Sequence, residues 1–117
     1  MPRVTRGNKK LLRRKKILAR AKGFFLTKGT NYRAAKEAVE KALSYAYRDR
    51  RNKKRDFRRL WNVRINAAVR AYDMSYSVFI HRLKEAGIQL NRKILSNLAA
   101  TEPETFARIV ERVKPQE

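Results

Sequence analysis

The sequence predicts an all-α protein in which a long, basic helical N-terminal arm is followed by a small helical bundle. Between Gly29 and Gly87 there is neither glycine nor proline, and the strong helix formers Ala, Glu, Lys, Arg and Leu make up much of that interval. Apolar residues recur at steps of three and four, whereas no convincing strand alternation is present. The charge is also uneven: residues 1–60 contain 22 Lys or Arg and 4 Asp or Glu, against 9 and 6 in residues 61–117.

The overall charge and the missing residue types exclude several classes of protein. The 117 residues carry a formal net charge of +21, and self-repulsion of this size opposes a compact state unless a polyanion supplies the opposite charge. With no cysteine and one histidine, disulfides, thiolate metal sites and His–His metal pairs are excluded, and we expect no metal and no cofactor. The longest uncharged stretches have eight residues, too few for a membrane span of roughly 18, and no apolar segment of a secretory signal follows the basic N-terminus. We therefore expect a cytoplasmic protein with a polyanionic partner, without a membrane location or a homo-oligomer.

The first half of the chain predicts two helices. Residues 9–22 favour a short basic helix, and residues 1–8 are expected to be disordered without a partner. Thr30 or Asn31 is a suitable N-cap for a second helix that continues to about Tyr72. Some 40 residues at 1.5 Å each would span roughly 60 Å, so part of this helix should project from a small domain. The apolar positions are Leu11, Leu12, Ile17, Leu18 and Ala21 in the first helix and Tyr32, Ala35, Val39, Ala42, Leu43 and Ala46 in the second.

The middle of the long helix is a basic tract, residues 48–59, in which eight of twelve residues are Lys or Arg and cover every face. A helix that is polar all round bridges through solvent or is unstable alone, and we expect surrounding phosphates to stabilise this one. Two further runs, Lys9–Lys10 and Arg13–Lys16, lie near the N-terminus. A merely solvated surface is the alternative, but the net charge of the first 60 residues favours phosphate binding, because each contact releases condensed counterions.

The second half predicts a bundle of about four helices, formed by the end of the long helix and three short ones. Ser75 and Asn91 are suitable N-caps, Gly87 predicts a helix stop, and Thr101–Glu104 fits a capping box with Pro103 early in the last helix. The residues expected to face inward are Leu60, Trp61, Ile65, Ala68, Val69 and Tyr72, then Tyr76, Phe79, Ile80 and Leu83, then Ile94, Leu95 and Leu98, and finally Phe106, Ile109, Val110 and Val113.

Aromatic residues are interleaved with the basic ones and could stack on exposed bases or pack in the protein. For Trp61, beside the bundle, packing is favoured, whereas for Phe24 and Phe25 both interpretations stay open. The segment Gly23–Thr30 is only faintly similar to a phosphate loop, since its order is Lys-Gly-Thr and no strand precedes it. Nothing orients Asp73, Ser75 and His81 as a triad, so we predict no catalytic site and no enzyme.

Two alternatives, a leucine-zipper DNA-binding protein and a membrane-surface helix, are less well supported than binding to RNA phosphates. A leucine zipper after the basic tract would place Leu60, Ala67 and Met74 in one seam, but no sustained apolar repeat follows. A membrane-surface helix needs an apolar face, which the basic tract lacks. A nucleoid-type or leucine-zipper-like DNA-binding protein remains the alternative to an RNA-binding one.

Several tracts together resemble the bacterial large-subunit ribosomal protein L-twenty family. The similarity runs in order from Arg3 to about Ala99, and only two positions depart from the expected pattern: Asn62, usually a branched apolar residue, and Asp73, usually glycine. The tracts are Arg14–Leu18, Ala21–Phe24, Tyr32–Arg33, Ala46–Arg58, Leu60–Trp61, Arg64–Ala68 and Leu90–Lys93.

The resemblance implies a primary rRNA-binding protein that acts early in large-subunit assembly. Residues 1–58 would form a basic arm that threads between rRNA helices. Residues 59–117 would form a small all-α domain that binds rRNA and contacts ribosomal protein L-twenty-one. Some members of the family also repress translation of their own messenger. The residues expected to bind rRNA are Arg3, Arg6, Lys9, Lys10, Arg13, Arg14, Lys15, Lys16, Arg20, Lys22, Phe24, Arg33, Arg48, Arg50, Arg51, Lys53, Lys54, Arg55, Arg58, Arg59, Arg64, Asn66, Asn91, Arg92 and Lys93.

Overall fold

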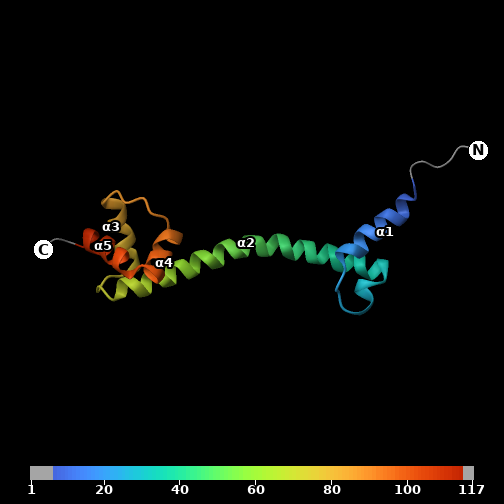
Figure 1. Ribbon diagram of the computed structural model, residues 1–117, viewed down its shortest axis with the longest axis horizontal. Helices are drawn as coiled ribbons and strands as arrows, with labels where there is room; N and C mark the ends of the chain where they lie inside the picture. Colours follow the sequence, from blue (N-terminus) through green and yellow to red (C-terminus); the bar gives the residue numbers. More distant parts are fainter. Residues whose placement is uncertain (1–6, 115–117) are drawn as a thin grey trace, which may run out of the picture. The chain divides into compact units, whose positions relative to one another are not determined.

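The computed structural model describes residues 7–114, and all the regular structure in this range is helical, which confirms the all-α prediction (Figure 1). Its contacts divide the chain into two compact units, Met1–Arg51 and Asn52–Glu117, and the long helix α2 contributes to both. Residues 1–6 lie outside the described range. They include the predicted RNA contacts Arg3 and Arg6 and most of the segment 1–8 that is predicted to be disordered. In chain order the elements are α1 (Lys9–Arg20), the 3-10 turn η1 (Leu26–Gly29), α2 (Tyr32–Arg70), α3 (Tyr76–Glu85), α4 (Arg92–Thr101) and α5 (Pro103–Val113).

The first unit has a small apolar cluster between α1 and the start of α2. Ala21, Ala35 and Val39 are buried, and three neighbouring side chains, Ile17, Leu18 and Phe24, pack against them. The rest of the predicted stripes stays outside this cluster: the exposed fractions of Leu11, Leu12 and Leu43 are 46%, 60% and 52%, and Ala42 is exposed too. The apolar stripe predicted at residues 32–46 is therefore buried only along the first two turns of α2.

The second unit has the larger core, to which all four of its helices contribute. Helix α5 packs against both α3 and α4, and the rings of Phe79 and Phe106 lie 5.7 Å apart between centroids. The last turns of α2 contribute Ile65 and Val69 to the same cluster. The buried apolar residues are Ile65, Val69, Met74, Phe79, Leu83, Leu95, Phe106, Val110 and Val113.

Local hydrogen bonds set most of the helix ends as the sequence predicts. Asn31, rather than Thr30, caps α2, since its Oδ1 accepts from the Arg33 amide at 3.2 Å. The Ser75 hydroxyl accepts from the Val78 amide at 3.5 Å, and Asn91 Oδ1 accepts from the Ile94 amide at 2.9 Å. Gly87 ends α3 with φ +69, the left-handed conformation that glycine adopts without strain.

Three predictions about the second unit are wrong. No capping box forms at Thr101, because this residue is the last of α4 and its hydroxyl donates to the Asn97 carbonyl at 2.9 Å. Leu60 is 40% exposed, since it lies about 140° around α2 from the buried Ile65. Ile94 is 44% exposed for the same geometric reason, because it lies about 100° from the buried Leu95.

Candidate nucleic-acid interface

All eight Lys and Arg side chains of the basic tract are exposed on α2. Only two of them have a carboxylate partner among the residues the structure describes. Arg48 Nε lies 2.9 Å from Asp49 Oδ1, and Arg59 Nη1 lies 3.8 Å from Asp56 Oδ1. The other six cations are therefore available to an external anion: Arg50, Arg51, Lys53, Lys54, Arg55 and Arg58.

Two arginines of the basic tract stack on exposed tyrosines one turn earlier. The guanidinium carbon of Arg51 lies 3.5 Å from the centroid of the Tyr47 ring, and its Nη1 donates to the Tyr47 carbonyl at 3.3 Å. The guanidinium carbon of Arg48 lies 4.6 Å from the Tyr45 ring centroid. These cation–π contacts already restrict each long arginine side chain in the free protein. Less conformational entropy is therefore lost when the side chain binds an anion.

The aromatic residues at the other end of the basic tract pack on each other. The rings of Phe57 and Trp61 lie 6.2 Å apart, and Lys53 Nζ lies 6.0 Å from the Phe57 ring centroid. Trp61 is half-buried and Phe57 is 44% exposed. Trp61 packs against Phe57 on the same helix, and the buried cluster of the second unit does not include it.

The N-terminal basic residues are all exposed where the structure describes them. Seven lie on α1, one in the turn that follows it, and one in the first turn of α2. Phe24, which the sequence groups with them, is half-buried against the cluster of the first unit, whereas Phe25 is 77% exposed. The side chain of Phe24 therefore packs within the protein, and its contact with RNA stays a prediction. The exposed cations are Lys9, Lys10, Arg13, Arg14, Lys15, Lys16 and Arg20 on α1, then Lys22 and Arg33.

The second unit brings three of its predicted RNA contacts together at the start of α4. Asn91 caps this helix, and Arg92 and Lys93 are its first two residues. Arg92 Nε donates to the Tyr76 hydroxyl at 2.7 Å, which leaves its two terminal amino groups for another acceptor. Two further predicted contacts lie on α2 after the basic tract, where Arg64 is exposed and Asn66 is half-buried.

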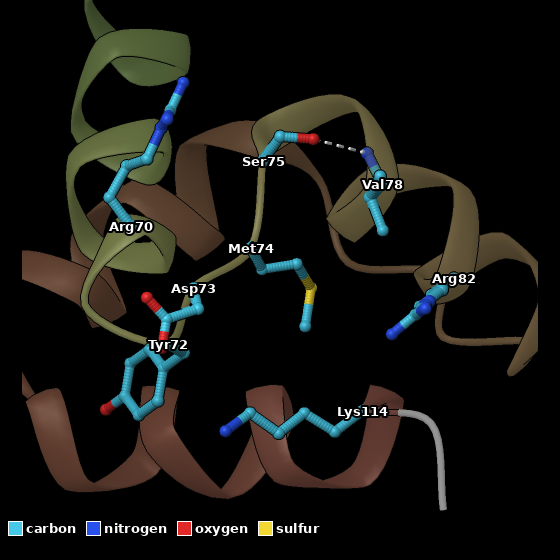
Figure 2. Close-up of a pocket in the computed structure, with 8 residues that line it drawn as sticks. All are labelled: Arg70, Tyr72, Asp73, Met74, Ser75, Val78, Arg82 and Lys114. Carbon is cyan, nitrogen blue, oxygen red and sulfur yellow. Dashed lines mark hydrogen bonds between the residues drawn. The ribbon is translucent and has the colours of Figure 1, made fainter. Parts of the chain in front are cut away.

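A cleft in the second unit gathers three cations that sequence reasoning did not single out (Figure 2). Arg70, Arg82 and Lys114 come from the end of α2, from α3 and from the residue after α5. Lys114 Nζ lies 5.6 Å from the ring centroid of Tyr72, which also lines the cleft. Isolated single cations this far apart in the chain give no sequence pattern, so only the fold could reveal their proximity.

Two other kinds of feature are absent from the described part of the chain. Among residues 7–114 no helix is both long and apolar enough to cross a bilayer. Within the same residues, no three His, Asp or Glu side chains gather in a way that could hold a metal ion.

Comparison with known proteins identifies the family. Residues 3–109 match the family described as Ribosomal protein L20. The large ribosomal subunit protein bL20 of Solibacter usitatus is 54% identical over 97% of this chain and 88% of that protein. The proteins of the same name from Picosynechococcus sp. and Acidithiobacillus ferrooxidans are each 56% identical, over 97% and 99% of this chain and 98% of each relative. These matches confirm the resemblance seen in the sequence, and the chain belongs to the ribosomal protein L20 family.

Proposed function

We propose that this chain is a structural protein of the large ribosomal subunit that binds large-subunit rRNA directly and promotes early assembly of the subunit. Membership of the family makes it a ribosomal protein that acts in translation in the bacterial cytoplasm, with a structural role and no enzymatic one. Its partners are rRNA and neighbouring ribosomal proteins.

The observation that carries direct RNA binding is the set of six basic-tract side chains without a carboxylate partner in the described residues. They follow one another over less than three turns of α2, so a single RNA strand would meet several of them. Each phosphate they neutralise releases condensed counterions, which favours binding in dilute salt. Arginine predominates here, and its planar fork suits bidentate contact with phosphate.

The two parts of the chain have different tasks in this proposal. The basic arm, residues 1–58, enters between rRNA helices, because basic side chains that cover about two thirds of the circumference of α2 can meet phosphates on several sides at once. Residues 59–117 bind rRNA with the residues at the start of α4 and on α2. Ribosomal protein L21 is proposed as the protein neighbour of this second part, as the family resemblance suggests.

The DNA-binding alternative is less well supported by the fold. A zipper seam through Leu60, Ala67 and Met74 would require a helix that includes all three, but α2 ends at Arg70 and Met74 is buried in the core. A nucleoid-type protein would bind duplex DNA at least as tightly as rRNA. Relative affinity for the two nucleic acids therefore separates the two functions.

The deciding experiment measures the affinity of the full chain for large-subunit rRNA fragments across a salt series, with duplex DNA of equal length as competitor. With six to ten phosphate contacts, affinity should fall by about 10³ to 10⁵ between 50 and 200 mM salt. A flat salt response would contradict the electrostatic mechanism. Preference for duplex DNA would assign the chain to the nucleoid instead.

A further inference from the structure

The connection between α1 and α2 has a closely packed backbone. Gly23 has φ +86, and the Phe24 amide donates to the Ala21 carbonyl at 3.0 Å. A Cβ at Gly29 would lie 3.0 Å from the Phe24 carbonyl oxygen and 3.6 Å from that of Ala21, so only glycine fits there without a shift of the backbone. These contacts hold the turn against the apolar cluster of the first unit, to which Ala21 and Phe24 belong.

The same turn presents two large apolar side chains to solvent. Phe25 is 77% exposed and Leu26 is 73% exposed, the two highest values among the large apolar residues of the described chain. Leu26 also has φ +50, a left-handed conformation that disfavours any residue with a Cβ. Exposure of a phenyl ring and a strained leucine are both unfavourable for the free protein. Backbone strain of this kind concentrates at functional sites, so the tip of the turn is a candidate contact.

The charges around the turn indicate what it contacts. The chain contains no acidic residue before Glu37, and the cations nearest to the turn in sequence are all exposed: Arg20, Lys22, Lys28 and Arg33. Cations account for attraction to phosphate, but a phenyl ring gains nothing from a phosphate. The part of RNA that matches an exposed aromatic ring is the face of an unpaired base, on which aromatic side chains stack.

We propose that Phe25 is a stacking site for an unpaired RNA base, with Leu26 beside it as an apolar contact and the surrounding cations on the adjacent phosphates. This inference rests on the proposed function and extends it from backbone contact to one nucleotide. It also separates the roles of the two neighbouring phenylalanines. Phe24 fixes the turn from within the cluster, and Phe25 binds the base.

The test uses the full chain, rRNA fragments and the substitutions Phe25→Ala, Phe25→Leu and Phe25→Tyr. Loss of a stacked base lowers affinity by about tenfold, so Ala and Leu should both weaken binding to that extent, whereas Tyr keeps the ring and should bind like the unsubstituted chain. The slope of log affinity against log salt should not change, because no phosphate contact is lost. Chemical probing of the bound RNA should show one unpaired base that is protected by the unsubstituted chain and by Phe25→Tyr but not by the other two.

The possible failures are distinguishable. If the unsubstituted chain prefers duplex DNA to rRNA, the proposed function itself fails. If it binds rRNA with a steep salt dependence and Phe25→Ala binds equally well with all bases equally protected, only the stacking site is refuted. Vesicles of anionic lipid supply a third arm, in which we expect no dependence on Phe25. Binding to vesicles that Phe25→Ala abolishes, with rRNA affinity unchanged, would assign the turn to a membrane and overturn the inference.

Discussion

Arg92 Nε donates to the Tyr76 hydroxyl at 2.7 Å, and this hydroxyl donates to Asn62 Oδ1 at 2.8 Å. The three side chains come from α4, α3 and α2 and are all half-buried, so the network joins three helices of the second unit. At Asn62 the family resemblance leads one to expect a branched apolar residue. The hydrogen bond from Tyr76 gives the amide oxygen a partner, which explains how this position tolerates a polar side chain.

Tyr76→Phe should disconnect this network without removing the ring. We expect the free energy of unfolding of the second unit to fall by about 1 kcal/mol, because two half-buried groups lose a hydrogen bond. Affinity for rRNA should fall a few-fold, since Arg92 is no longer held in one orientation. Fluorescence of Trp61, the only tryptophan, reports unfolding, and a binding titration reports affinity. Tyr72→Phe is the matched control, because Tyr72 contacts Lys114 and the second core through its ring. Equal effects of the two substitutions would refute a specific role for the network.

Asp73 occupies a position at which the resemblance leads one to expect glycine, and its φ is +56. Aspartate tolerates this left-handed conformation better than most residues but still at a cost. Asp73→Gly should therefore raise the free energy of unfolding of the second unit by about 1 kcal/mol. Asp73→Ala also removes the carboxylate but retains a Cβ, and it should not stabilise. Thermal unfolding of the two variants decides, and equal midpoints would show that backbone strain is not the cause.

Phe79 and Phe106 form the central ring contact of the second core, and both are almost fully buried. Phe79→Ala should cost about 3–5 kcal/mol, through lost burial and the cavity left behind. A unit of this size has only marginal stability, so much of it should unfold at physiological temperature. Phe57→Ala, at a partly exposed position on α2, is the control and should change stability by less than 1 kcal/mol. Circular dichroism at 37 °C would reveal the difference, and a folded Phe79→Ala variant would contradict the proposed core.

Local chemistry made much of the fold predictable. Asn31, Ser75 and Asn91 cap their helices, and Gly87 ends α3. These effects depend only on residues two or three positions away, so the sequence alone can predict them. Thr101 failed as a cap, because α4 continues through it and places its hydroxyl beside the Asn97 carbonyl. The sequence could not settle this point, since the same residue is chemically suited to either end of a helix.

The candidate interface was predictable only where charge is dense along the chain. The basic tract is evident from composition, and its exposure follows from the cost of burying unpaired cations. The contact of Tyr76 with Arg92 spans 16 residues, and the cleft cations Arg70, Arg82 and Lys114 come from three separate segments of the chain. Such contacts depend on how the helices pack, which no local pattern specifies.

The two units should differ strongly in the free protein. The first has three buried apolar residues and a high positive charge, whereas the second has nine. We expect residues 1–58 to be largely unprotected from hydrogen exchange without RNA and the core helices of the second unit to be protected. An rRNA complex measured in parallel is the control, in which protection should extend along the basic arm. Uniform strong protection of residues 9–55 in the free chain would contradict this expectation.

The basic tract should act in assembly rather than in peptide-bond synthesis. Arg50, Arg51, Arg55 and Arg58 spread over about 140° of the surface of α2, so they form one broad basic face that can meet several phosphates. Alanine at all four should weaken rRNA binding broadly and lower the salt slope by about three, because backbone contacts position the protein without reading sequence. Lysine at all four retains the charge and should keep most of the slope.

Cells with the alanine variant should accumulate incomplete large subunits, most strongly in the cold, where misfolded RNA rearranges slowly. Sedimentation profiles and a peptidyl-transfer assay on completed particles test this, and normal assembly with lost peptidyl transfer would refute it, since no side chain of the tract has a chemical role to lose.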